Sequence, residues 1–251
     1  MLQCLAADTG APMLTLRPSI SRSRHSAGTG PADFKSIRLL ADIPEPHIHD
    51  LTRVAWQERF TPRTVVIAEE APCEALYGLI EGTVEVLSGV DDQETVIDVV
   101  EAGSALLLAC VMTGIPYVAS VRTLSQVRIL AIPATAVREL FDGDKGFARS
   151  VAGELSRGSC RMLLDLKSLK IRTSIERLAD WLIAMADGQA NGNGAFRLPF
   201  GKRTLASRLG MTPECLSRSL RALAAHGVHV RGREVILADR PTLAAFAGQE
   251  Q

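Results

Sequence analysis

The segment at residues 202–223, KRTLASRLGMTPECLSRSLRAL, constrains the fold more than any other part of the chain. Its first half has an apolar face formed by Leu205, Ala206 and Leu209. Gly210 follows directly and supplies a residue at which a helix can stop and the chain can turn. The segment therefore predicts a short first helix that ends near Leu209.

A second helix is predicted to begin at Thr212. The Thr212 hydroxyl can accept from an amide of the first turn, and Pro213 stands where its missing amide hydrogen costs nothing. Glu214 is favoured by the positive end of the helix dipole. Leucines recur at spacings of four and three and predict the buried stripe of this helix: Leu216, Leu220 and Leu223.

The opposite face of the second helix is polar and largely basic. A helix-turn-helix places the start of its second helix in the major groove, where Glu accepts from cytosine, Arg pairs bidentately with guanine and Ser bonds several base edges. Residues 201–222 hold five basic residues and one acid, whereas the whole chain has 28 of each, so phosphate attraction is local. The expected DNA contacts are Lys202, Arg203, Thr204, Thr212, Pro213, Glu214, Ser217, Arg218 and Arg221. A helix pair used only for packing is the alternative.

The length of 251 residues and the 47% hydrophobic content suit one large or two modest domains with real cores. No apolar run reaches the roughly 18 residues needed to span a bilayer, so we expect no membrane contact and a cytoplasmic location. Residues 1–33 are rich in Ser, Gly, Pro and Arg and are expected to be a disordered extension. A transit peptide and a misassigned start codon are alternatives for that segment.

The cysteines are widely scattered along the chain: Cys4, Cys73, Cys110, Cys160 and Cys215. No pair has the spacing of a zinc site, so isolated thiols and no metal are expected. Cys215 lies on the predicted second helix, where oxidation or nitrosation could block DNA binding. A small buried side chain is the simpler interpretation of this residue.

Short β-rich runs from about residue 59 to 136, separated by Gly, Pro and Asp, predict a barrel or sandwich. A helix at 46–57 is expected before them. After Gly143 a long helix is expected to reach about Lys170, with the seam of a two-stranded coiled coil. The seam positions are Ala148, Ala152, Leu155, Ser159, Met162, Leu166 and Leu169, of which Leu155, Met162, Leu166 and Leu169 are the expected dimer contacts. A helix packed on its own barrel is the alternative.

The end of the chain completes a winged helix-turn-helix. A helix is expected at 174–187, and two short strands at 228–230 and 234–237 flank a tight basic turn at Arg231-Gly232-Arg233. A sensor barrel, a long helix and this module, in that order, resemble the CRP/FNR superfamily of bacterial transcription regulators over residues 34–245. The resemblance is carried by TLAxxLGMTPExLSR at 204–218, LYGLIEG at 76–82 and ASVR at 119–122.

The resemblance implies an α+β fold in four parts. These are a disordered extension (1–33), a jelly-roll β-barrel like that of cyclic-nucleotide-binding domains (34–143), a dimerisation helix (144–171) and a winged helix-turn-helix domain (172–251). It further implies a homodimer that binds double-stranded DNA and RNA polymerase and is not an enzyme. In FNR-like proteins the loop corresponding to 91–94 touches the polymerase.

Glu214, Ser217 and Arg218 match the E-x-x-S-R of FNR-type members. This match implies a TTGAT-N4-ATCAA-like palindrome as the DNA target. The nucleotide-binding members carry Gly-Glu and Arg-Ser/Thr pairs, where this chain aligns Leu107-Leu108 and Tyr117-Val118. Without a buried cation to pair with it, a cyclic phosphate would lose its hydration at an uncompensated free-energy cost, so cyclic AMP is not expected.

FNR holds an iron–sulfur cluster on four thiolates, and this chain offers only Cys4 in its amino-terminal region, so no cluster is expected. The residues left for an effector form an expected apolar pocket: Leu106, Leu107, Leu108, Val111, Met112, Tyr117 and Val118. Their pattern is similar to the NnrR/DNR branch, which implies control of denitrification or low-oxygen respiration genes in response to nitric oxide, through haem.

An axial haem ligand would have to come from His47, His49, His25, Met112 or a cysteine, and the sequence does not choose among them. Within the family, the alternatives are a FixK-like regulator without an effector and a regulator that responds to a cyclic nucleotide. His47 and His49 also suggest a cupin-type metalloenzyme, but the downstream Glu and third His of that fold are missing.

Overall fold

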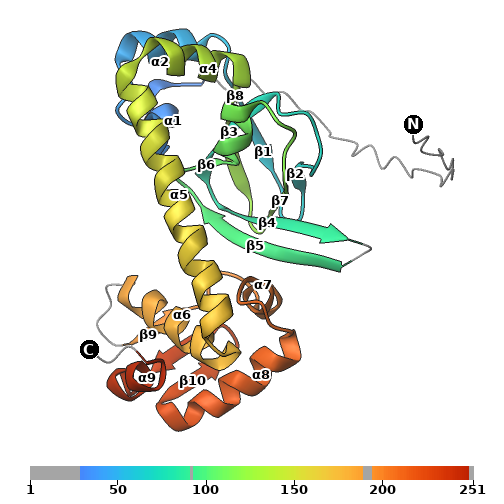
Figure 1. Cartoon of the computed structure of the whole chain (residues 1–251), viewed down its shortest axis with the longest axis vertical. Coiled ribbons are helices and arrows are strands. Elements are labelled where there is room, and N and C mark those ends of the chain that lie inside the picture. The colour runs from blue at the N-terminus through green and yellow to red at the C-terminus, as the bar shows by residue number, and fades with distance from the viewer. Residues whose placement is uncertain (1–28, 91–92, 189–193, 249–251) are drawn as a thin grey trace, which may run out of the picture.

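The computed structural model describes residues 29–90, 93–188 and 194–248. The predictions for residues 1–28 of the amino-terminal extension, including Cys4 and His25, and for Asp91 and Asp92 therefore lie outside the described residues. The expected disorder is wrong at the end of the extension, because a helix begins at Pro31 and Asp33 forms an ion pair with Arg128 at 2.7 Å. Figure 1 shows two parts joined by one long helix: a β-rich part above and a smaller, mostly helical part below.

Short helices open the β-rich part and pack on its upper end: α1 (Pro31–Lys35), η1 (Arg38–Leu40) and α2 (Glu45–Thr52). The prediction of a helix over 46–57 is wrong at its end, because β1 begins at Trp56. Trp56 pairs with Ala131 and Phe60 with Val127 in an antiparallel ladder. This pairing with a distant strand overrides the local helical pattern.

Two four-stranded sheets form the β-rich part, with strand orders β1-β8-β3-β6 and β2-β7-β4-β5. The bounds are β1 Trp56–Phe60, β2 Val65–Ile67, β3 Ala75–Glu81, β4 Thr83–Val90, β5 Gln93–Glu101, β6 Ser104–Leu106, β7 Ser120–Thr123 and β8 Val127–Pro133. Between the sheets lies a core that includes Leu79, Val84, Leu106, Val121 and Ile129. Helix α3 (Leu108–Thr113) interrupts the strand sequence, and α4 (Ala134–Gly143) follows it. The prediction of a barrel or sandwich is confirmed.

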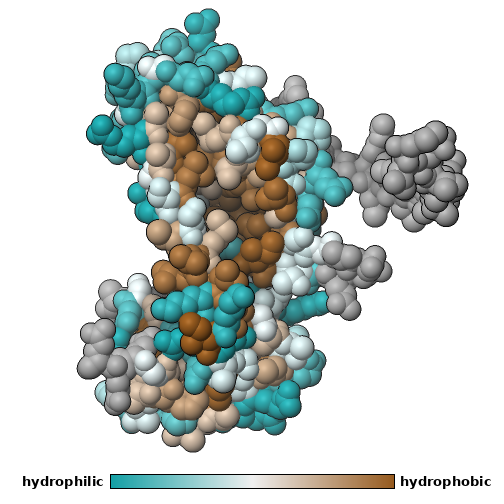
Figure 2. Space-filling model, viewed as in Figure 1, coloured by the Kyte–Doolittle hydropathy of each residue, from teal (hydrophilic) through white to brown (hydrophobic). Residues whose placement is uncertain are grey.

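The long helix α5 spans Lys145–Ile171, close to the predicted bounds. Its first turn is capped by Asp144, whose Oδ1 accepts a hydrogen bond from the Phe147 amide at 2.6 Å. Phe147 and Val151 are buried against the β-rich part, whereas most later residues of the helix are exposed. Figure 2 shows apolar surface along this helix and in a hollow beside it.

The lower part contains α6 (Ser174–Gly188), β9 (Ala195–Arg197), α7 (Lys202–Arg208), α8 (Pro213–Ala222), η2 (Leu223–His226), β10 (Val228–Arg231), β11 (Glu234–Leu237) and α9 (Arg240–Phe246). The strands form a sheet of order β10-β11-β9. Its core joins Leu182 of α6, Leu205 of α7, Leu216 of α8 and Val235 of β11. The predicted α+β fold, with a β-rich domain, a long helix and a winged helix-turn-helix, is confirmed.

Candidate nucleic-acid interface

Helices α7 and α8 form the helix pair that the sequence predicts. Helix α7 ends at Arg208, and Gly210 follows with φ 62°, in the left-handed region that favours glycine. Thr212 then caps α8, because its Oγ1 accepts from the Cys215 amide at 3.2 Å. The turn and the cap both depend on residues that are local in sequence.

One face of α8 is buried, as the leucine spacing predicts. Leu216 and Leu223 are 0% exposed and Leu220 is 9% exposed. The opposite face is open to solvent and forms a shallow surface lined by Pro213, Glu214, Ser217, Arg218 and Arg221. The residues expected to read bases therefore lie together on the exposed start of the second helix.

Hydrogen bonds within α8 position parts of this face. The backbone amide of Glu214 and the Thr212 hydroxyl hydrogen-bond to the Glu214 carboxylate and hold its pKa below the usual value. Arg218 makes a smaller contribution in the same direction. Glu214 therefore remains an ionised acceptor. The Ser217 hydroxyl donates to the Pro213 carbonyl at 2.9 Å, and Arg221 Nε donates to the Ser217 carbonyl at 3.3 Å.

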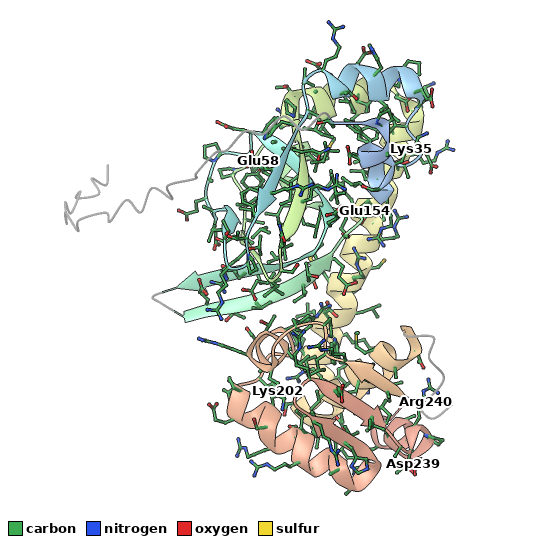
Figure 3. All side chains as sticks on the ribbon, turned by 180° about the vertical axis from the view of Figure 1, so that it is seen from behind. Lys35, Glu58, Glu154, Lys202, Asp239 and Arg240 are labelled. Carbon is green, nitrogen blue, oxygen red and sulfur yellow. The ribbon has the colours of Figure 1, made fainter. Side chains whose placement is uncertain are left out.

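A second groove runs between α8 and the wing strands. Its lining residues are Lys202, Ser217, Leu220, Arg221, Ala224, Val228, His229, Val230, Arg231 and Ile236. Lys202, labelled in Figure 3, extends from the start of α7 at this side of the domain. His229 and Arg231 are exposed here beside the α8 face, and sequence analysis did not name them as DNA contacts. The basic turn at 231–233 was the signal that could have identified Arg231.

Thr204 lies apart from the other expected DNA contacts. Arg203 is exposed, but Thr204 is half-buried and its Oγ1 lies 3.5 Å from Oε2 of Glu85, in the β-rich domain. A side chain expected to contact DNA thus contacts the β-rich domain in this structure.

The expected effector pocket does not form as one unit. Leu106 and Tyr117 belong to the core between the sheets, with Leu107 packed against it, whereas Leu108 and Val111 belong to the core under the first helices, with Met112 packed there. Val118 is 59% exposed. The reason is the entry into α3, where the chain turns sharply between the two cores.

That turn places Leu107 at φ 48° and ψ 39°, in the left-handed region that a leucine rarely adopts. Leu107 is aligned with the glycine of the nucleotide-binding pair, a residue that takes this conformation without strain. Nearby, the Tyr117 hydroxyl donates to the Ala75 carbonyl at 2.5 Å and is buried. Leu107 thus adopts a backbone conformation typical of glycine while carrying an apolar side chain.

The two histidines of α2 lie beside acidic side chains. His47 Nε2 lies 3.4 Å from Asp144 Oδ2 at the start of α5, and His49 is exposed beside Asp50. Within the described ranges, no three side chains of His, Cys, Asp or Glu gather in an arrangement that could hold a metal ion. Nor is any helix in the described part of the chain long and apolar enough to cross a membrane.

The expected dimer contacts divide along α5. Met162 is 68% exposed, and Leu166 and Leu169 are each 49% exposed. Leu155 is half-buried and packs against the core that Phe147 and Val151 enter, so it contacts its own β-rich domain. The first turns of α5 thus pack on the barrel and the later turns present an apolar stripe.

Comparisons with known proteins agree with this arrangement. Residues 57–144 match the family model of the cyclic nucleotide-binding domain, and residues 176–246 match that of the Crp-like helix-turn-helix domain. Together the two matches cover more than half of the chain. No curated protein matches it.

Several solved structures are similar to this chain. One is a protein from Silicibacter pomeroyi DSS-3 proposed to be a cAMP-binding regulator, which is 25% identical in sequence. The match covers 86% of this chain and 97% of that chain, with a TM-score of 0.57. FixK2 from Bradyrhizobium japonicum has 22% identity, coverage of 76% and 96%, and a TM-score of 0.65. A CRP-family transcriptional regulator from Thermus thermophilus has 21% identity, coverage of 76% and 96%, and a TM-score of 0.62. The last two likenesses show the fold. With a cyclic nucleotide-binding domain, a long helix and a Crp-like helix-turn-helix in one chain, this protein belongs to the CRP/FNR family of DNA-binding transcription regulators.

Proposed function

We propose that this regulator reads an FNR-type palindrome, TTGAT-N4-ATCAA, through the exposed start of α8. The observation that carries the proposal is the common face formed by Glu214, Ser217 and Arg218. An ionised glutamate, a hydroxyl and a guanidinium at the start of a recognition helix match the donors and acceptors of base edges in the major groove.

The proposed regulator binds DNA as a homodimer. A palindrome mirrors the two-fold axis of a dimer, and a single recognition helix reads too few base pairs for useful specificity. The exposed stripe of Met162, Leu166 and Leu169 on α5 supports pairing through this helix.

Two substitutions test the base-reading role. Arg218→Ala removes a proposed base contact and is expected to cost about 1–3 kcal/mol on the palindrome and to relax preference at one base position. Lys202→Ala removes a proposed phosphate contact and should weaken palindromic and random duplexes alike. Fluorescence anisotropy at fixed salt measures both. Equal losses on the two duplexes for Arg218→Ala would exclude base reading by this residue.

For the signal we propose nitric oxide, with genes of nitrogen-oxide or low-oxygen respiration as targets. Support comes from the L-x-x-x-x-M-x-x-x-P-x-Y-V-A pattern around α3 and from Tyr117 and Val118 at the positions where nucleotide binders carry a phosphate-gripping pair. Haem does not fit the described residues as they are packed, because the α3 side chains are divided between two cores and His47 lies 3.4 Å from Asp144.

An effector-independent regulator is the second candidate, and the filled barrel favours it. Leu106 is 2% and Tyr117 is 4% exposed in the core between the sheets. Anaerobic DNA binding by the protein alone, the protein with nitric oxide, and the protein with haem and nitric oxide separates the candidates. Tight binding only with nitric oxide supports the sensor, whereas equal binding in all three supports the second candidate.

RNA polymerase is the proposed protein partner, through the hairpin between β4 and β5. Glu94 on this hairpin forms an ion pair with Arg122 at 2.7 Å, which ties it to the sheet. Charge reversal at 91–92 tests the proposal by transcription in vitro. Lost activation with unchanged DNA affinity supports it, and unchanged transcription removes it.

A further inference from the structure

Helix α7 of the DNA-binding domain lies against strand β5 of the sensor domain, directly below it in Figure 1. Strand β5 is an edge of its sheet. The Val96 amide donates to Ser207 Oγ at 2.7 Å, and Arg208 Nη1 donates to the Val99 carbonyl at 3.3 Å. Backbone groups of an open sheet edge are thus paired with side chains of the first helix of the helix-turn-helix.

An ion pair and apolar contacts reinforce this docking. Arg208 Nη2 lies 3.1 Å from Asp98 Oδ1, whose side chain is 49% exposed. Val96 and Val99 are each 8% exposed and belong to the same core as Leu205 of α7. The contact is therefore an interface with a hydrophobic centre and a charged rim.

A buried carboxylate stands at the other end of the contact. Glu85 is 4% exposed, and its Oε1 lies 2.7 Å from both Nε and Nη2 of Arg122. Its Oε2 faces the Thr204 hydroxyl at 3.5 Å. The sensor domain thus presents two carboxylates, those of Glu85 and Asp98, to α7.

We propose that this contact is an autoinhibitory latch on DNA binding. In a helix-turn-helix complex the first helix crosses the DNA backbone. Here Arg208 of that helix is paired with Asp98, and Thr204 faces Glu85. Two side chains of α7 therefore contact the sensor domain and not DNA. The proposal rests on α7 and α8 being the DNA-binding surface. Release of the latch frees Arg208 for phosphate and removes the facing carboxylates.

The test uses the full-length protein with Asp98→Ala. The charge-matched control is Glu101→Ala, which removes an exposed acid from the same strand. Because an exposed ion pair is weak, Asp98→Ala should tighten binding about 1.4- to fivefold on palindromic and random duplexes at low salt. The slope of log K against log salt should steepen by about 0.9 as one phosphate contact is gained. Glu101→Ala should change the DNA affinity and the salt slope much less than Asp98→Ala does.

A double-mutant cycle with Arg208→Ala identifies the partner. In the Arg208→Ala background, Asp98→Ala should give no gain beyond that of Glu101→Ala. Hydrogen exchange supplies a measurement without DNA, because the Val96 amide held by Ser207 should exchange faster in Asp98→Ala.

Equal affinity and exchange in Asp98→Ala and Glu101→Ala would overturn the latch, and so would weaker DNA binding by Asp98→Ala. Failure of the palindrome proposal is distinguishable from these results. It would appear as equal affinity of the wild-type protein for palindromic and random duplexes, while the Asp98→Ala gain could still be measured on both.

Discussion

Nε of Arg177 on α6 lies 3.0 Å from the carbonyl oxygen of Leu209, the residue that closes the first helix of the DNA-binding pair. The same guanidinium donates to the carbonyl of Arg172 at 2.8 Å and reaches that of Gly210 at 3.4 Å. One side chain therefore joins the end of α5, α6 and the turn before the recognition helix. It satisfies carbonyls that a helix end leaves without internal partners.

Arg177→Ala is expected to destabilise the DNA-binding domain by about 1–3 kcal/mol, because hydrogen bonds from a charged group are lost at once. Urea denaturation followed by circular dichroism measures the change. Lys170→Ala, an exposed basic residue near the end of α5, is the control and should have little effect. An unchanged unfolding midpoint in Arg177→Ala would show that the turn before the recognition helix is stable without the Arg177 hydrogen bonds.

Leu166→Glu is expected to dissociate the proposed dimer, because it places a charge in the apolar stripe of α5. Sedimentation velocity should show a shift toward the monomer at micromolar concentration, with DNA affinity falling in parallel. Lys167→Glu places the same charge on the neighbouring exposed position and should leave the dimer intact. A stable dimer in Leu166→Glu would place the interface elsewhere.

Arg231→Ala tests the wing as an additional contact. Its exposed guanidinium lines the groove beside α8, so its loss should weaken palindromic and random duplexes alike and reduce the salt slope by about 0.9. The matched control is Arg240→Ala, whose guanidinium pairs with Asp187 at 2.7 Å. A salt slope equal to that of the control would remove Arg231 from the interface.

Cys73 should react slowly with alkylating agents at neutral pH. Burial raises the pKa of its thiol, and the hydrogen bond with Tyr117 offsets only part of that shift. Because the thiolate is the nucleophile, a raised pKa lowers the reactive fraction at every pH below it. Mass spectrometry should show that the exposed Cys160 is modified first, and that the modification rate of Cys73 increases as pH rises. Equal rates for the two thiols at neutral pH would contradict the raised pKa.

The predictable features of the DNA-binding site are those encoded within a few residues. The Thr212 cap, the left-handed Gly210 and the buried positions of Leu216 and Leu220 follow from side-chain chemistry and helical spacing alone. The end of α2 was predicted incorrectly because Trp56 joins a strand that pairs with β8, about 75 residues further along the chain.

The sequence by itself determined the family, the order of a β-rich domain, a long helix and a winged helix-turn-helix, and the chemistry of the α8 face, because motif spacing and helix capping are local properties. Only the tertiary structure decided that Leu155 packs on its own barrel and that the α3 residues divide between two cores. The same holds for Ser207 and Arg208, which dock on the edge of β5. These contacts join residues more than a hundred positions apart, and no periodicity in the chain specifies which sheet edge a helix will cover.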